Sequence, residues 1–197
     1  MTKPNCRKGG FLALLALFVF SIAFQAAEGQ HPTVPALCGE AKVTLGNPVY
    51  LTTSLGMVTL EPPQGWALDK ARENPFYLLK SGEKYESART LIYINIERLE
   101  VPFQRAIQSD ARAFSESCQP SRIQDVDQPE ILEQGCERKA QMFFCERKQG
   151  AYVDLATKIS VEGLLLNIVL SADSTAEISR YRKDYDYLLK HLALVSR

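Results

Sequence analysis

Histidine is scarce in this chain of 197 residues, which contains only His31 and His191. The sequence also has no C-x-x-C and no G-x-S-x-G motif. A zinc site built from histidine and cysteine therefore lacks ligands, and a serine hydrolase of the common type lacks its nucleophile turn. We accordingly expect no metal, no cofactor and no enzymatic activity. A hydrolase with an unrecognised site is a third hypothesis, behind the two binding roles described below.

The chain has no excess of charge of either sign. Lys and Arg number 23 and Asp and Glu number 23, and the two signs are interspersed. Binding to nucleic acid requires a concentrated positive surface, so we expect no nucleic-acid partner.

Long apolar runs are absent apart from one near the N-terminus. Three basic residues stand in the first eight positions, no charge occurs from Phe11 to Phe24, and small residues follow at Ala27 and Gly29. This pattern predicts a signal peptide over residues 1–29 and a mature chain that begins at Gln30 and is secreted or periplasmic. The apolar run is shorter than the roughly 20 residues of a membrane span. We therefore expect no span after cleavage, with a retained anchor as the alternative.

Four cysteines remain once Cys6 leaves with the signal peptide. An even number in an exported chain predicts two disulfides, for which three pairings exist. A straight strand from Cys136 to Cys145 would hold these two about 30 Å apart, too far for a bond that needs Cα atoms within about 7 Å. We predict Cys118–Cys136 and Cys38–Cys145, because Cys118 ends a predicted helix and Cys136 opens the next strand.

The residue pattern predicts a single α+β domain over residues 43–197, after an irregular lead-in at 30–42. Period-two alternation and turn residues predict strands, and three- and four-residue spacing predicts helices. The expected strands are Val49–Thr53, Met57–Glu61, Trp66–Asp69, Phe76–Lys80, Thr90–Arg98, Arg138–Arg147, Ala151–Ile159 and Leu164–Ala172. The last of these strands is almost continuously apolar and is expected at the centre of the sheet.

Two helices are predicted, one in mid-chain and one at the end. The first covers Pro102–Ser117, with Asp110 as an unexpected acid on its apolar stripe. The second begins at the capping box formed by Ser174 and Glu177 and carries an apolar stripe that reaches Leu192. Between them, residues 119–135 are expected to form a polar connection with a short strand at Glu130–Leu132.

The order of these elements resembles the PsbP-type α/β/α sandwich, an antiparallel β-sheet meander flanked by helices. The resemblance rests on the Pro-Pro-Gln-Gly-Trp turn at residues 62–66, on Phe76-Tyr77 and Leu91–Ile96, and on the terminal Tyr187-Leu188-Leu189. It covers about Val49 to Val195. The fold is found in extrinsic photosystem proteins, in a Ran-binding nuclear import factor and in exported bacterial proteins, so it implies an architecture and no particular function.

Five aromatic residues from neighbouring segments are the candidate binding residues: Trp66, Phe76, Tyr77, Tyr85 and Tyr93. We expect a monomeric, non-enzymatic domain that binds a protein or another envelope component with the loops around Trp66, Phe76 and Tyr85. One alternative is that these aromatics are core. Another is that the set lines a groove for a small molecule or lipid.

Overall fold

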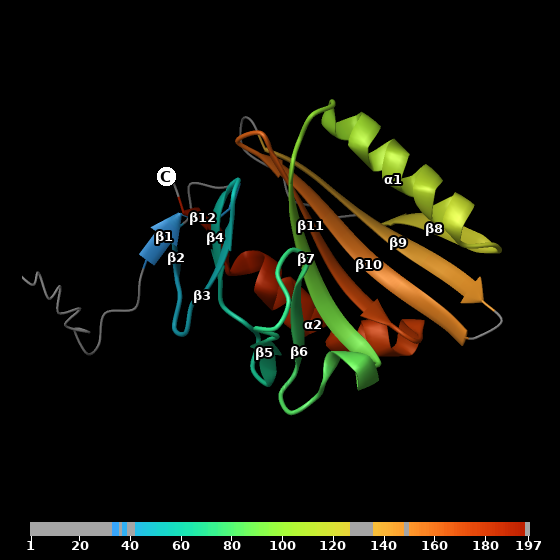
Figure 1. Ribbon diagram of the computed structural model, residues 1–197, viewed down its shortest axis with the longest axis horizontal. Helices are drawn as coiled ribbons and strands as arrows, with labels where there is room; N and C mark the ends of the chain where they lie inside the picture. Colours follow the sequence, from blue (N-terminus) through green and yellow to red (C-terminus); the bar gives the residue numbers. More distant parts are fainter. Residues whose placement is uncertain (1–32, 36, 39–41, 127–135, 148–149, 196–197) are drawn as a thin grey trace, which may run out of the picture. The chain divides into compact units, whose positions relative to one another are not determined.

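The computed structural model describes residues 33–35, 37–38, 42–126, 136–147 and 150–195. Within them the largest sheet has seven antiparallel strands in the order β5-β6-β7-β11-β10-β9-β8 (Figure 1). These strands are Trp66–Leu68 (β5), Phe76–Lys80 (β6), Thr90–Arg98 (β7), Ser121–Val126 (β8), Glu137–Arg147 (β9), Gly150–Val161 (β10) and Leu164–Ala172 (β11). The expected central position of the Leu164–Ala172 strand is confirmed.

Two helices pack on opposite faces of this sheet, which confirms the predicted α+β class (Figure 1). The first, α1 (Phe103–Ser117), packs Phe103 and Ile107 against Leu165. The second, α2 (Thr175–Lys190), belongs to the large core cluster that contains Leu166. Neighbouring residues of a strand point to opposite sides, so these contacts define an α1 face and an α2 face of the sheet.

The α2 face forms the main hydrophobic core. Ile92, Ile94 and Ile96 of β7 are fully buried there, as their alternation predicts. The helix that covers them begins as expected, because Ser174 Oγ accepts a hydrogen bond from the Glu177 N–H at 3.3 Å. Further along the helix, the buried Tyr185 hydroxyl donates to the Ile168 carbonyl at 2.7 Å and so ties α2 to the central strand.

Smaller sheets complete the α2 side. The strands β3 (Val49–Thr53), β4 (Gly56–Leu60) and β12 (Leu192–Val195) form a three-stranded sheet, and β1 (Thr33–Pro35) pairs with β2 (Lys42–Thr44).

Two predictions near the ends of the chain are therefore wrong. Leu192 belongs to a strand and not to the terminal helix, because the chain leaves the helix at His191 and pairs with β4. The lead-in at 30–42 is not irregular throughout, because it contributes Thr33–Pro35 as a strand and a hydrogen bond from the Leu37 N–H to the Leu192 carbonyl at 2.9 Å.

Two disulfides are present among the described cysteines, but their predicted pairing is wrong. The bonds join Cys38 to Cys136, with Cα atoms 5.5 Å apart, and Cys118 to Cys145, with Cα atoms 5.7 Å apart. The reason is the strand β8 (Ser121–Val126), which directly follows α1, whereas we expected the strand of this connection only further on, at Glu130–Leu132. In the β8–β9 register Ser121 lies opposite Cys145, so Cys118 reaches the far end of β9 and not its start.

The remaining predictions near the N-terminus and in the long connection concern residues outside the described ranges. These are the signal peptide at 1–29, the mature start at Gln30 and the short strand at Glu130–Leu132. No helix in the described part of the chain is both long and apolar enough to span a membrane. Two disulfides indicate an oxidising compartment, extracellular or periplasmic.

Candidate functional site

The five candidate aromatic residues do not form one group, because they lie on both faces of the sheet. Trp66 and Phe76 are buried in the main core on the α2 face. The indole N–H of Trp66 donates to Asp184 Oδ2 at 2.7 Å, and its ring meets Tyr181 edge-on at 5.6 Å. Trp66 and Phe76 are therefore parts of the core, which is the alternative that the sequence left open.

The three tyrosines gather on the α1 face. Tyr77 of β6 lies directly opposite Tyr93 of β7, and their ring centroids are 6.1 Å apart. Tyr85, from the 3₁₀ turn η1 (Tyr85–Ser87), packs edge-on against Tyr77 at 4.7 Å. Burial, followed by the hydrogen bond to Tyr85, raises the pKa of Tyr77. The signal that separates Phe76 from Tyr77 was present in the sequence, since consecutive strand residues face opposite sides.

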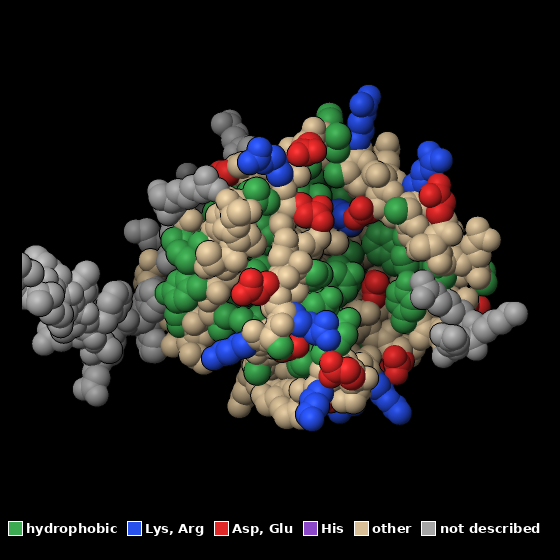
Figure 2. Space-filling view, viewed as in Figure 1, with side chains coloured by type: hydrophobic (Ala, Val, Ile, Leu, Met, Phe, Trp, Pro, Cys, Tyr) green, Lys and Arg blue, Asp and Glu red, His purple; other side chains and the backbone are tan. Residues whose placement is uncertain are grey.

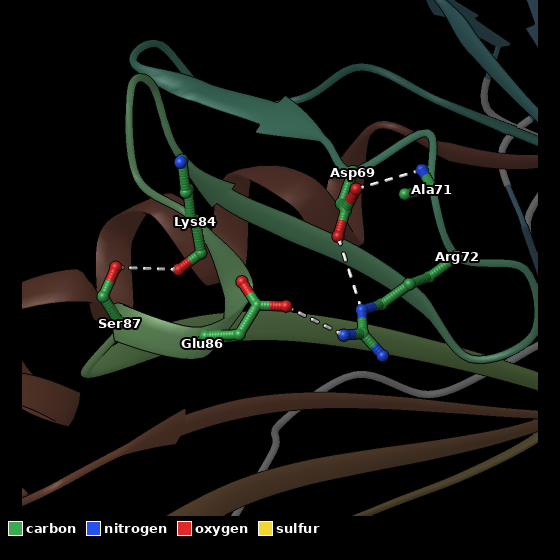
Figure 3. A network of polar contacts seen from close by, with 6 residues as sticks. All are labelled: Asp69, Ala71, Arg72, Lys84, Glu86 and Ser87. Carbon is green, nitrogen blue, oxygen red and sulfur yellow. Dashed lines mark hydrogen bonds and ion pairs between the residues drawn. The ribbon is translucent and has the colours of Figure 1, made fainter.

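Arg72 joins this tyrosine cluster to the loops at the sheet edge. Its guanidinium lies 3.8 Å from the centroid of the Tyr85 ring. It also forms ion pairs with Asp69 at 3.6 Å and with Glu86 at 3.3 Å, as Figure 3 shows. Asp69 is itself positioned by a hydrogen bond from the Ala71 N–H at 3.0 Å. The result is an arginine that is held in one orientation although its side chain is 40% exposed.

An open hollow of about 700 Å³ adjoins this network and is called the loop hollow here. Its walls come from residues 67–72, Leu79, Lys80 and residues 82–86. Four basic side chains and three acidic ones line it: Lys70, Arg72, Lys80, Lys84, Asp69, Glu83 and Glu86. Of the five predicted aromatic residues only Tyr85 contributes to it, so the hollow is a charged surface and not the aromatic-lined groove that we considered.

A second set of polar groups lies on the α1 face and was not recognised in the sequence. Lys158 of β10 is almost fully buried, with 4% of its side chain exposed, and its ammonium meets Asp110 Oδ2 of α1 at 2.7 Å. This ion pair accounts for the acid on the apolar stripe of the helix. Asp154 lies four residues before Lys158 on β10 and is also largely buried. This burial raises the pKa of its carboxyl group to about 6. Strand alternation places Asp154 on the face opposite the buried Val153 and Leu155, but alternation carries no information about how deeply a side chain is buried.

The histidine of the described residues contacts its own helix. The ring of His191 stacks on Tyr187 at 3.9 Å, and its Nδ1 lies 2.8 Å from the Tyr187 carbonyl oxygen. No group of three or more histidine, cysteine, aspartate or glutamate side chains in the described part of the chain is placed to hold a metal ion. His31 lies outside the described residues.

The described chain is thus a disulfide-bonded α+β sandwich, and solved structures share that architecture. It resembles the Saccharomyces cerevisiae Ran-binding protein Mog1p with a TM-score of 0.51 and 12% identity, over 76% of this chain and 96% of that one. The solution structure of PsbP (CyanoP) from Synechocystis matches with a TM-score of 0.39 and 10% identity, over 81% and 98%. The match to Mog1p confirms the sandwich fold that the PsbP-type resemblance led us to expect.

A crystal structure from Bacteroides thetaiotaomicron matches with a TM-score of 0.46 and 8% identity over 71% of this chain, which spans 46% of the length of that protein. No protein-family model and no curated protein matches the sequence. The likeness to Mog1p shows the fold alone, and the function has to be argued from the surface of this chain.

Proposed function

We propose that the protein is an exported, non-enzymatic domain that binds a protein partner through the loop hollow. In this proposal the signal peptide at 1–29 directs export, and the domain acts as a monomer. The observation that carries it is the preorganised pair of Arg72 and Tyr85 at the rim of an open, charged hollow. Arginine and tyrosine are among the residues that contribute most to protein interfaces.

The construction of the rim supports this role. Arg72 is held by two carboxylates and an aromatic ring, so little conformational freedom is lost when a partner binds. The surrounding charges of both signs favour a polar protein surface as the partner, since complementary charge sets orientation and specificity. Yeast Mog1p, a Ran-binding protein, is an instance of protein recognition by this fold.

The carrier hypothesis receives less support from the same hollow. Its volume of about 700 Å³ exceeds the roughly 300 Å³ that a small-molecule site needs. However, seven charged side chains line it, whereas sites for lipids and similar ligands are predominantly apolar. A flat or charged partner surface fits this lining better than an apolar molecule does.

The proposal is tested by capturing partners from the native extracytoplasmic fraction and then measuring affinities with the purified partner. Tyr85→Ala should weaken binding at least tenfold, because it removes the ring that supports Arg72. Tyr50→Ala is the matched control, since Tyr50 is a 53% exposed tyrosine on β3 and not part of the hollow. Equal affinities for wild type and Tyr85→Ala would remove the loop hollow as the binding surface. Turnover abolished by altering one acidic or serine residue would overturn the non-enzyme proposal.

A further inference from the structure

A cavity of about 100 Å³ lies on the α1 face, between helix α1 and the middle of the sheet. Figure 2 shows this side of the molecule, where hydrophobic and acidic side chains lie in a hollow below α1 in the view. The cavity is formed by different residues from those of the loop hollow, so it is considered independently of the proposed function.

The strand register divides the floor of this cavity into three rows. In the first row Asp154 lies opposite Phe143 on one side and Ser171 on the other. In the middle row Ala156 lies opposite Val169, and in the third Lys158 lies opposite Asn167. The distance along β10 from the first row to the third is about 13 Å, at roughly 3.3 Å per residue. The cavity is therefore a slot with polar ends and a short apolar middle.

Two acceptor atoms in the slot have no protein donor. Oδ1 of Asp154 and Oδ1 of Asn167 are buried, and no described residue hydrogen-bonds to either. Ser171 lies opposite Asp154 on β11 and its side chain lowers the pKa of the Asp154 carboxyl group, but the Oδ1 atom has no donor among the described residues. Buried acceptors without protein donors are uncommon in folded proteins, so their position in one cavity marks a place for a hydrogen-bond donor from outside the chain.

The charge at the Asp154 end is also unbalanced. The buried cation that lines the cavity, Lys158, is paired with Asp110 at 2.7 Å, and its ammonium also lies 5.6 Å from the centroid of the Phe143 ring. Asp154, Asp110 and Lys158 together carry one net negative charge when all three side chains are ionised. Because its pKa is about 6, Asp154 is ionised at pH 7.5. A cation is therefore the complement that the cavity lacks within its own lining.

Aromatic rings line the first and middle rows of the slot, where Phe143 lies opposite Asp154 and Tyr93 lies opposite Val169. Phe114 of α1 packs edge-on against Phe143 at 5.0 Å and lies 6.3 Å from Tyr152, and Tyr93 forms part of the cavity wall. Aromatic faces attract ammonium groups in particular, whereas a hard metal ion requires six or more oxygen ligands. The apolar floor at Ala156 and Val169 suits a short carbon stem.

From this arrangement we propose that the slot binds a short alkylammonium group, with the ammonium at Asp154 and the stem over Ala156 and Val169. The group is either a small free amine or a lysine side chain of another molecule, since both present the same chemistry. A volume of about 100 Å³ accommodates roughly three water-sized groups, which matches an ammonium on a stem of a few carbons.

The test follows amide chemical shifts of the purified protein by NMR at pH 7.5 during titration with n-propylammonium chloride. Saturable shifts are expected near Asp154, Ala156 and Val169. Isosteric 1-propanol and potassium chloride at equal concentration are the controls, and neither should produce them. A saturable shift with potassium chloride, equal binding of 1-propanol, or no saturable shift with n-propylammonium would each overturn the proposal.

Variants locate the effect. Asp154→Asn should weaken n-propylammonium binding at least tenfold, while Asp125→Asn, an exposed acid paired with Lys139 on the same face, should not change it. Ala156→Val keeps every charge but fills the apolar floor, and it should weaken binding at least fivefold. Unchanged affinity in both Asp154→Asn and Ala156→Val would contradict the assignment. Tighter binding of Nα-acetyl-lysine methylamide than of n-propylammonium would identify a lysine side chain as the natural group, and the reverse a free amine.

Discussion

The two faces of the main sheet are made by the same strands but differ in chemistry. On the α2 face, β7, β10 and β11 present fully buried aliphatic side chains such as Ile94, Leu155 and Ile168. On the α1 face the same strands present Tyr93, Asp154 and Asn167, which line a cavity. The first arrangement maximises buried apolar area, which stabilises the fold. The second leaves charged groups and acceptors in a place where they oppose folding, and binding is the role that accounts for them.

The largest expected losses of stability concern the two disulfides. One of them lies toward each face of the sheet. Cys38–Cys136 closes a span of 98 residues within the main core cluster, and Cys118–Cys145 closes 27 residues at the end of α1. In the chain-entropy model, replacing both cysteines by alanine should cost about 4.7 kcal/mol for the first bond and about 3.6 kcal/mol for the second. Urea unfolding of the two double variants measures this, and a larger loss for the Cys118–Cys145 pair would break the comparison.

The next contrast concerns the helices. Leu188→Ala on α2 should destabilise the protein by about 2–5 kcal/mol, because Leu188 is completely buried in the main core. Ile107→Ala on α1 is the matched change, at a residue that packs in a small separate cluster with Phe103 and Leu165. We expect its cost to be smaller, because the surroundings of a small cluster relax more easily around a cavity. Equal losses in urea unfolding would show that both faces are packed alike.

A third contrast concerns a substitution on the α1 face that should stabilise the protein and not destabilise it. Burial raises the pKa of Asp154 from 3.8 to about 6, so the folded state binds a proton more readily than the unfolded state does. This group therefore stabilises the protein as the pH falls through 6 toward 4, by on the order of 3 kcal/mol. Asp154→Asn should be more stable than wild type by a similar amount at pH 7.5, and the difference should vanish near pH 4. A difference independent of pH would contradict this account of Asp154.

The main elements could be predicted from the sequence because their signals are local. Alternation of Ile92, Ile94 and Ile96 indicated β7, and the capping box of Ser174 and Glu177 indicated the start of α2, both of which the structure confirms. The strand β8 was missed because none of its residues is buried, so no apolar pattern marks it. The wrong disulfide pairing followed from that omission.

The candidate sites were less predictable, since their signals depend on contacts that are distant in the sequence. Asp110 and Lys158 explain each other only when α1 lies against β10. The burial of Asp154 and the unpaired acceptor of Asn167 likewise depend on how the helix covers the sheet. The separation of Phe76 from Tyr77 was different, because strand alternation alone would have placed them on opposite faces.

The claim that the α1 face retains destabilising groups for binding is tested most directly by urea unfolding with and without n-propylammonium chloride at pH 7.5. Binding to the folded state alone should raise the unfolding midpoint of the wild type with increasing n-propylammonium, and it should raise the midpoint of the more stable Asp154→Asn variant much less. An unchanged wild-type midpoint, or an equal rise in both proteins, would contradict the account.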